Sequence, residues 1–565
     1  MRRKALLTTL PLLSLGLLAV ACAPAPAPEP APAPPDAAAL AAAVEQSIDG
    51  ELLRSHVAAL SDDALAGRGP ASEGDAAARA YLVEQMTALG LEPGAADGSW
   101  EQPMQIVGIT SKAPTEWPFL GGRRGLVLSW WDDFIAASGV QEERAEIRQA
   151  ELVFVGYGIV APEYGWNDYK DVDVTGKVLL MLNNDPEWDP ALFAGERRLY
   201  YGRWTYKYEQ AAKRGAAGAI IIHTTPSAGY PYQVVQTSWT GEQFELPGSP
   251  RSQIEAWVTE AAAAKLAKLA GQDLAALVEA ARSADFRPVP FDVTTSLKLR
   301  NEIRQVETAN VAGLLRGSDP ELAREVVVYT AHHDHLGVGE PNDQGDTIYN
   351  GALDNGTGCA QVLAIAKAFT ELPEAPRRSV LFLFVAAEEQ GLLGSRFYAQ
   401  NPTFAAGRIA ANINLDGGNI WGRTTDLAFI GYGKSSLDTV VEAAAARQER
   451  RVVGDQFPDR GYFYRSDQFN FAKIGVPAIY LDTGVDFIDR PEGWGKEQID
   501  AWTEIHYHQP SDELTDEWDF TGMVDDARLA LECGLAVTKS DELPAWKPGD
   551  EFEAARLEAL ATLGG

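Results

Sequence analysis

Short apolar runs alternate along this chain with stretches whose apolar residues recur at helical spacing. The runs VVVYTAHH, SVLFLFVAAEE and VPAIYLDTG are apolar over most of their length, which is typical of strands buried on both faces of a sheet. The segment Asp75–Gly94 has helical spacing and reaches a glycine that would end a helix. Strands that alternate with helices in this way predict an α/β fold.

Polar residues stand where these apolar runs end. Five of the seven histidines lie in YTAHHDHLGVG (329–339) and EIHYHQPSDE (504–513), and acidic residues lie in YNGALDNGTG, VAAEEQGLLGS, NINLDGG and YRSDQFNF. If the strands lie side by side, these groups meet at one edge of the sheet, where open α/β sheets bind ligands. Clustered carboxylates need a compensating cation, because like charges raise one another's pKa. The pattern therefore indicates a bound metal pair.

The pattern of strand, turn and helix signals changes between about residues 145 and 285. The segment AELVFVGYGIVAPEYGWNDYKDVDVTGKVLLML is rich in strand and turn signals, and YKYEQAAKRGAAGAIIIH then reads as a helix leading into a strand. We expect this part to be an inserted module with its own core.

The chain starts with a basic segment, an apolar run and small residues before Cys22. This order is typical of a secretory signal and resembles a bacterial lipoprotein signal, in which the cysteine is lipidated; simple cleavage is the alternative. The Ala-Pro alternation that follows predicts a stiff, extended spacer. We therefore expect an exported protein, periplasmic or on the cell surface, that touches the membrane only through a lipid anchor at Cys22.

Composition excludes some classes of function and some kinds of site. The formal net charge of −32 repels phosphate backbones, so we expect no binding to nucleic acid. Only Cys359 and Cys533 follow Cys22, which predicts neither a disulfide framework nor a cysteine-ligated zinc site.

The motifs occur in the order H-x-D, D-N-G-x-G, E-E, N-x-D-G, S-D and Y-H-x-x-x-D, and this order resembles the M28 family of zinc aminopeptidases. The resemblance runs from about Leu52 to about Ala530 and implies a mixed twisted sheet flanked by helices. The inserted segment resembles the protease-associated domain of several members. The expected divisions are a signal peptide (1–21), an Ala/Pro-rich linker (22–35), two parts of the catalytic domain (36–144 and 286–545), the β-rich insert (145–285) and a C-terminal tail (546–565).

The resemblance also implies a ligand set for two zinc ions. One ion would be held by His332, Asp354 and Asp416, and the other by Asp354, Glu389 and His508, with Asp354 as the bridge. Nitrogen and oxygen ligands suit zinc, and a shared carboxylate suits a pair of ions. The peptide bond after Asp354 is expected to be cis.

Three further residues take roles in the same resemblance. Glu388 would be the general base that moves a proton from water to the leaving amine. Asp334, two residues after His332, would orient that imidazole. Tyr464 is a candidate hydrogen-bond donor to the oxyanion, with aromatic packing as the alternative.

The other histidines of the two patches match no ligand position. His333 and His335 are expected to be loop residues that shape the site or face solvent. His506 competes with His508, and the register of the Y-H-x-x-x-D motif favours His508.

These features favour a two-zinc aminopeptidase that acts on peptides, and three alternatives stay open. The first is a carboxypeptidase of the same fold, although no cluster of basic residues is obviously placed to hold a substrate carboxylate. The second is a single-zinc glutaminyl cyclase, which the inserted module argues against. The third is a non-catalytic, receptor-like binding protein, which the complete ligand set argues against. The chain has neither the His-Glu-x-x-His helix nor the Gly-x-Ser-x-Gly turn of other hydrolases.

Overall fold

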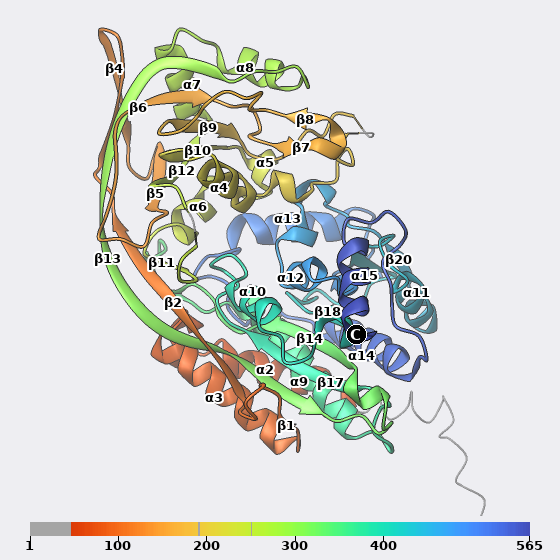
Figure 1. Ribbon diagram of the computed structural model, residues 1–565. Helices are drawn as coiled ribbons and strands as arrows, with labels where there is room; N and C mark the ends of the chain where they lie inside the picture. Colours follow the sequence, from red (N-terminus) through yellow and green to blue (C-terminus); the bar gives the residue numbers. More distant parts are fainter. Residues whose placement is uncertain (1–46, 190–191, 250, 565) are drawn as a thin grey trace, which may run out of the picture.

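A mixed β-sheet forms the centre of the lower half of the molecule in the computed structural model, which describes residues 47–189, 192–249 and 251–564 (Figure 1). The signal segment, Cys22 and the spacer lie outside the described residues. The strands of this sheet follow the order β2 (Glu101–Lys112), β13 (Val289–Leu315), β17 (Ser379–Val385), β14 (Val326–His332), β18 (Ile409–Asn414), β21 (Ala478–Asp482), β19 (Asp426–Ile430) and β20 (Arg451–Val453). Strands β17, β14, β18 and β21 are parallel, so the predicted α/β fold with a mixed sheet is confirmed.

Helices cover both faces of this sheet because its central strands are apolar on both sides. In β14, Val327 and Tyr329 pack into one core and Val326 and Val328 into the other. The first core is completed by α2 (Gly50–Leu60), α3 (Glu73–Ala88), α9 (Thr357–Thr370), α11 (Asp438–Arg447) and α14 (Thr521–Lys539), and the second by α10 (Leu393–Gln400) and α12 (Gln468–Lys473). The continuous apolar runs of the sequence thus reflect burial on two faces.

The helix expected over Asp75–Gly94 is α3, which ends earlier, at Ala88. Gly90 follows with a φ of +75°, and this left-handed residue ends the helix before Gly94.

The upper half is a second α/β unit. Its sheet has the order β6 (Arg144–Phe154), β9 (Val178–Leu182), β10 (Gly218–His223), β12 (Ile254–Thr259) and β5 (Phe134–Ser138), beside the hairpin β3 (Glu116–Gly121) and β4 (Arg124–Ser129). The helices of this unit are α4 (Trp204–Lys213), α5 (Thr225–Ala228), α6 (Tyr232–Ser238), α7 (Glu260–Leu269) and α8 (Leu274–Ala281). One of its apolar cores draws on residues from Trp117 to Leu299, so it begins before residue 145 and ends after residue 285.

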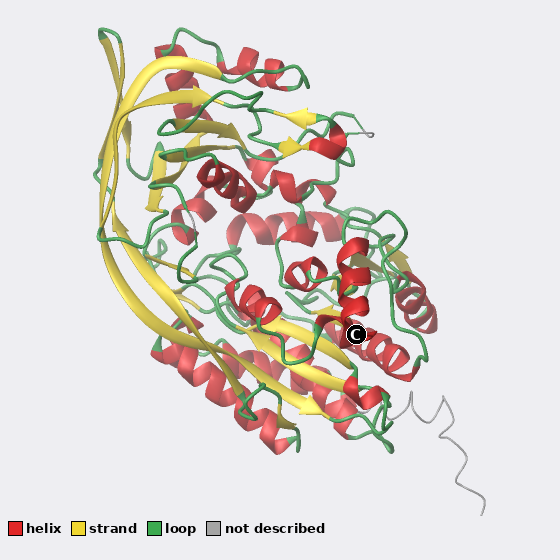
Figure 2. Ribbon diagram, viewed as in Figure 1, coloured by secondary structure: helices red, strands yellow, loops and turns green. Residues whose placement is uncertain are grey.

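Strand β13 joins the two halves. Its first part pairs with β6 of the upper unit, residues 300–311 pair with β2, and its last part pairs with β17 of the lower sheet. Figures 1 and 2 show this strand and β2 curving together along one side of the molecule. Strand β11 (Glu242–Glu245) pairs with the other edge of β2.

Smaller elements complete the chain. These are β1 (Glu92–Pro93), the pair β7 (Val160–Ala161) and β8 (Trp166–Asn167), the pair β15 (Gly337–Val338) and β16 (Ile348–Tyr349), and the helices α13 (Trp494–Ile505) and α15 (Glu553–Ala561). Within the described ranges, every helix is too short or too polar to cross a bilayer. Cys359 and Cys533 are buried free thiols.

Candidate metal centre

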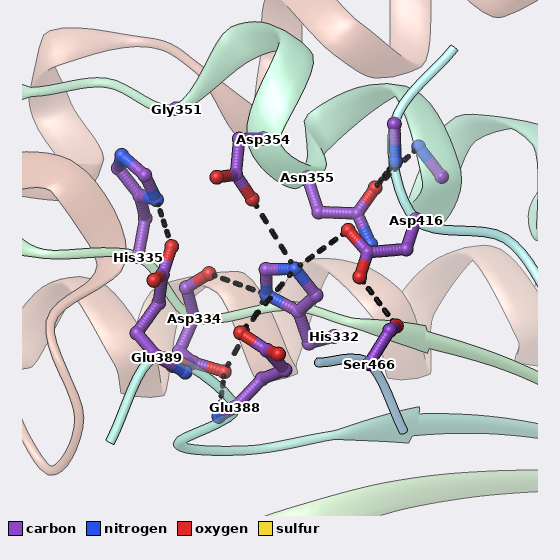
Figure 3. Close-up of polar contacts among 12 residues, drawn as sticks. His332, Asp334, His335, Gly351, Asp354, Asn355, Glu388, Glu389, Asp416 and Ser466 are labelled. Atoms are coloured by element: carbon purple, nitrogen blue, oxygen red, sulfur yellow. Dashed lines mark hydrogen bonds and ion pairs between the residues drawn. The ribbon is translucent and has the colours of Figure 1, made fainter. Parts of the chain in front are cut away.

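The parallel strands carry the candidate residues to one edge of the lower sheet. His332 is the last residue of β14 and pairs with Val385, the last residue of β17, so Glu388 and Glu389 begin just beyond that edge. Asp416 follows β18 in the same way. Figure 3 shows these side chains around a common centre, together with Asp354 from the turn before α9.

The first set of ligand atoms surrounds His332. Its Nε2 lies 3.3 Å from Oδ1 of Asp354 and 3.2 Å from Oδ1 of Asp416. Tetrahedral zinc with bonds of about 2.0–2.2 Å would place neighbouring ligand atoms about 3.3–3.6 Å apart. The spacing of these atoms therefore fits the edges of a zinc tetrahedron.

The second set surrounds His508. Its Nε2 lies 3.3 Å from Oδ2 of Asp354 and 3.1 Å from Oε2 of Glu389. This nitrogen is buried and forms no hydrogen bond with either acid. The two oxygens of Asp354 thus face the two histidines separately, which is the placement required of a bridging carboxylate.

A tight turn presents Asp354. The Asp354–Asn355 peptide bond is cis, as expected. Gly351 has a φ of +58°, and a Cβ there would lie 2.3 Å from the backbone oxygen of Asp354, so only glycine fits. The carboxylate of Asp512 accepts hydrogen bonds from the backbone N–H groups of Leu353 (2.8 Å) and Asp354 (3.1 Å). Asp512 is the last residue of the Y-H-x-x-x-D motif, and its role in holding this turn was not predicted from the motif.

The acids at this centre depend on positive charge. Burial opposes charge on His508, but Glu389 and Asp354 outweigh it and raise the pKa of His508 to about 9. Burial likewise opposes ionisation of Glu389, but His508 lowers its pKa to about 2. Protonated imidazoles therefore balance the carboxylates when no metal is bound. A metal cation would take over this role and leave the imidazoles neutral, as ligands must be.

Glu388 differs from its neighbour. Its Oε2 lies 3.9 Å from Nε2 of His332, and burial followed by the charge of Glu389 raises the pKa of Glu388 well above its usual value, against the influence of His332. Ala387 has a φ of +54°, which turns the chain sharply before the two glutamates. They leave the strand end in different directions (Figure 3).

Asp334 supports this turn. Its Oδ1 accepts a hydrogen bond of 3.0 Å from the backbone N–H of Glu388, and its Oδ2 one of 3.4 Å from that of Glu389. The contact with His332 runs through the backbone oxygen of Asp334, 3.1 Å from Nδ1 of the imidazole. The carboxylate of Asp334 is 3.8 Å from the same nitrogen.

The remaining histidines divide into two groups. His335, expected to shape the site or face solvent, lies with Nδ1 2.6 Å from Oε1 of Glu389. His333 turns away and contacts Asp75 of α3 at 3.0 Å. His506 contacts Ser511, so His508 is the histidine of its patch that faces the acids.

The upper unit also contributes to the centre. Oγ of Ser238, the last residue of α6, lies 2.7 Å from Nδ1 of His508. An Nδ1–H that donates to Ser238 leaves Nε2 free to act as a ligand. No sequence motif marks Ser238, because this contact depends on how the two halves pack.

Tyr464 is buried, and its hydroxyl donates a 2.7 Å hydrogen bond to Glu551. Its proposed role toward an oxyanion stays a prediction.

Comparison with known proteins agrees with the geometry. Residues 310–531 match the model of Peptidase family M28, and this segment contains all the candidate ligands. The fold and the acid and histidine centre agree with this match, which concerns residues 310–531.

Several individual proteins similar to this chain are aminopeptidases. A probable leucine aminopeptidase 2 of Aspergillus fumigatus is 27% identical over 402 residues, which cover 68% of this chain and 67% of that protein. A probable lipoprotein aminopeptidase, LpqL, of Mycobacterium tuberculosis is 30% identical over 259 residues, 43% of this chain and 46% of that protein. The solved structure of an aminopeptidase from Aneurinibacillus sp. strain AM-1 superposes with a TM-score of 0.52 at 18% identity, over 89% of this chain and 97% of that one. This last likeness concerns the fold.

Proposed function

We propose that the protein is a two-zinc aminopeptidase that removes N-terminal residues from peptides. The observation that carries the proposal is the position of Asp354, whose two oxygens face His332 and His508 at 3.3 Å each. The match to an M28 peptidase model and the aminopeptidase relatives support the same activity.

The ligand set fits zinc. His332, Asp354 and Asp416 would hold one ion, and Asp354, Glu389 and His508 the other, through nitrogen and oxygen atoms that zinc accepts. When bound, the ions would supply positive charge that polarises a carbonyl group and acidifies water. Ser238 and His335 would fix the orientation of the second ligand set through His508 and Glu389.

Glu388 would act as the general base. Its carboxylate lies at the edge of the first ligand set without belonging to the bridged arrangement. In the proposed reaction Glu388 accepts a proton from the water that attacks the scissile carbonyl and delivers this proton to the amine that leaves. The hydrogen bonds from the backbone of Glu388 and Glu389 to Asp334 would hold the base in place.

The upper unit is proposed to be a protease-associated domain. Its core, which spans residues from Trp117 to Leu299, would extend the insert beyond the range 145–285 read from the sequence. Its contact with His508 through Ser238 gives the domain a part in the site.

We also propose export and a lipid anchor at Cys22. The order of basic, apolar and small residues before Cys22 supports this, as does the name of the mycobacterial relative, a lipoprotein aminopeptidase.

Peptides that differ only at the N-terminus test the activity. A peptide with a free amino group should lose its first residue, its N-acetylated form should not, and a chelator should abolish the reaction until zinc is restored. Equal hydrolysis of both peptides would contradict an aminopeptidase, and cyclisation of an N-terminal glutamine without hydrolysis would indicate the cyclase instead.

A further inference from the structure

Two arginines, one from each half of the molecule, line a cavity beside the candidate metal centre. A cavity of about 170 Å³ is lined by Arg203 and Arg465 together with Glu388, Glu389 and His508. Arg203 stands directly before α4 of the upper unit, and Arg465 belongs to the motif YRSDQFNF of the lower unit. Their guanidinium groups therefore share a cavity with the proposed chemistry.

Neither arginine has a carboxylate partner. Across the described ranges, Arg203 and Arg465 form no ion pair, and the buried Nε of Arg203 has no hydrogen-bond partner. Arg465 donates a 2.9 Å hydrogen bond to the hydroxyl of Tyr507. The other direct partners are aromatic rings: Trp204 for Arg203, and Tyr230, Tyr462 and Tyr507 for Arg465. These partners are neutral, so within the described ranges neither guanidinium group has an anionic counter-ion.

Other acids of the same cavity are already paired. Glu245 forms ion pairs with Arg251 and Arg396, and Glu255 lies 2.9 Å from Arg251. Glu209 accepts a hydrogen bond from Tyr200. None of these acids forms an ion pair with Arg203 or Arg465.

The positive charges of Arg203 and Arg465 repel each other and have no carboxylate between them. Burial, followed by the charge of Arg465, lowers the pKa of Arg203 to about 10. Like charges held together in a partly desolvated cavity are unfavourable unless an anion joins them. Arginine binds carboxylates through paired hydrogen bonds of fixed geometry.

We propose that Arg203 and Arg465 form a subsite for a carboxylate of the substrate, an inference that rests on the proposed peptidase function. Tyr507, which accepts from Arg465, has its ring centroid 3.9 Å from that of His508. The subsite thus begins one side chain away from a proposed ligand. The carboxylate bound there would be the C-terminal group of a very short peptide or an acidic side chain next to the scissile bond.

Sequence analysis found no basic cluster for such a group, because Arg203 and Arg465 are far apart in the chain. The fold brings them together at the boundary between the halves. The preferred substrates would therefore be short or acidic peptides.

Two matched peptide pairs test the subsite on the full-length protein. The first is a dipeptide and its C-terminal amide, and the second is an amidated tripeptide with glutamate or glutamine in the second position. In at least one pair the carboxylate-bearing member should show a kcat/KM higher by about 10- to 100-fold, as expected for hydrogen bonds to a charged group. The first pair identifies a terminal carboxylate and the second an acidic side chain.

Variants connect this preference to the arginines. Arg203→Gln should abolish the preference, and Arg203→Lys, which keeps the charge without the paired geometry, should retain part of it. Arg197→Gln removes an equal charge from an exposed position nearby and should leave the preference unchanged. Melting temperatures of all variants report whether each has folded.

Binding provides a readout that does not need hydrolysis. Calorimetry on the chelator-treated protein should show tighter binding of the carboxylate-bearing member, and Arg203→Gln should lose this difference. Such binding without any hydrolysis would support the subsite and refute the proposed function. Hydrolysis of every peptide with no preference in either pair would overturn the subsite and leave the function intact.

Discussion

Glu388 and Glu389 are neighbours of equal charge whose surroundings differ. Oε2 of Glu389 lies 3.1 Å from Nε2 of His508, and Oε1 lies 2.6 Å from Nδ1 of His335. The nearest histidine nitrogen to Glu388 is 3.9 Å away, on His332. This difference agrees with the proposal that Glu389 is a metal ligand and Glu388 the general base.

We predict that glutamine substitutions separate these roles. Glu388→Gln should keep both metals and lower kcat by about 10²- to 10⁴-fold, because it removes a positioned base. Glu389→Gln should instead lose the second zinc, because it removes an anionic ligand. Metal analysis together with kcat and KM for both variants checks this. Loss of zinc from Glu388→Gln, or a kcat within about threefold of the parent, would show that the two assignments are wrong.

The sequence predicts the residues of this site better than their contacts. The order of motifs identified the candidate ligands, and the structure brings them together at one edge of the sheet. The contact of His335 with Glu389 was not foreseen, because it depends on the path of the loop after β14. The carboxylate of Asp334, expected to orient His332, lies 3.8 Å from Nδ1 of that imidazole and also accepts hydrogen bonds from the backbone N–H groups of Glu388 and Glu389.

Helix α6 connects the upper unit to the metal centre through a single hydroxyl group. Ser238→Ala should weaken zinc binding at the second position about tenfold, because residues that orient a metal ligand commonly contribute that much. Competition with a chelator measures this affinity. Ser283→Ala, a change at an exposed position of the same unit, is the control. Equal affinities in the two variants would exclude a positioning role for Ser238.

Helix α2 and strand β10 each bury a histidine that resists protonation. Burial lowers the pKa of His56 and of His223 to about 4. In the unfolded chain each histidine has its ordinary pKa of about 6.5, so the unfolded state takes up a proton at a pH where the folded state does not. The free energy of unfolding is therefore highest above about pH 6.5 and falls as the pH drops toward 4. Each histidine should lower the free energy of unfolding by about 2 kcal/mol when the pH falls from 7.5 to 5.

His56→Gln tests this dependence and retains a polar group near Tyr81, whose hydroxyl lies 2.7 Å from Nδ1 of His56. Urea unfolding at pH 7.5 and 5 should show a smaller loss of stability for the variant than for the parent. An identical loss in both proteins would mean that His56 is not the group that titrates.

Secondary structure could be predicted from the sequence where burial determines which positions are apolar. The three apolar runs are strands β14, β17 and β21, because strands covered on both faces must be apolar throughout. The end of α3 was missed, because Gly90 and Gly94 are equally plausible stops and only the packing chooses between them. Burial alternates in the first part of β13 and is continuous over residues 308–314, where the strand enters the lower sheet. The sequence analysis did not foresee that one strand of 27 residues serves two cores.

For the molecule as a whole, the bridged ligand set predicts that metal and fold are linked. The purified protein should contain about two zinc ions per chain, and removing them should lower the melting temperature, because bound metal stabilises the folded state. Measurement of metal content and melting temperature before and after chelation checks both effects. A reproducible content of one zinc with full activity would contradict the bridging role of Asp354.

The continuity of β13 has a consequence for how the chain folds. Residues 300–311 pair with residues 101–112, so this ladder closes a loop that contains most of the upper unit. Contacts between such distant segments form slowly, because the chain loses the entropy of loop closure before the new contacts stabilise it. We therefore expect the two halves to dock late, after each has formed its own core. Ser238 belongs to the upper unit and His508 to the lower unit, so their contact forms only when the two halves dock. During refolding, enzymatic activity should therefore return later than secondary structure.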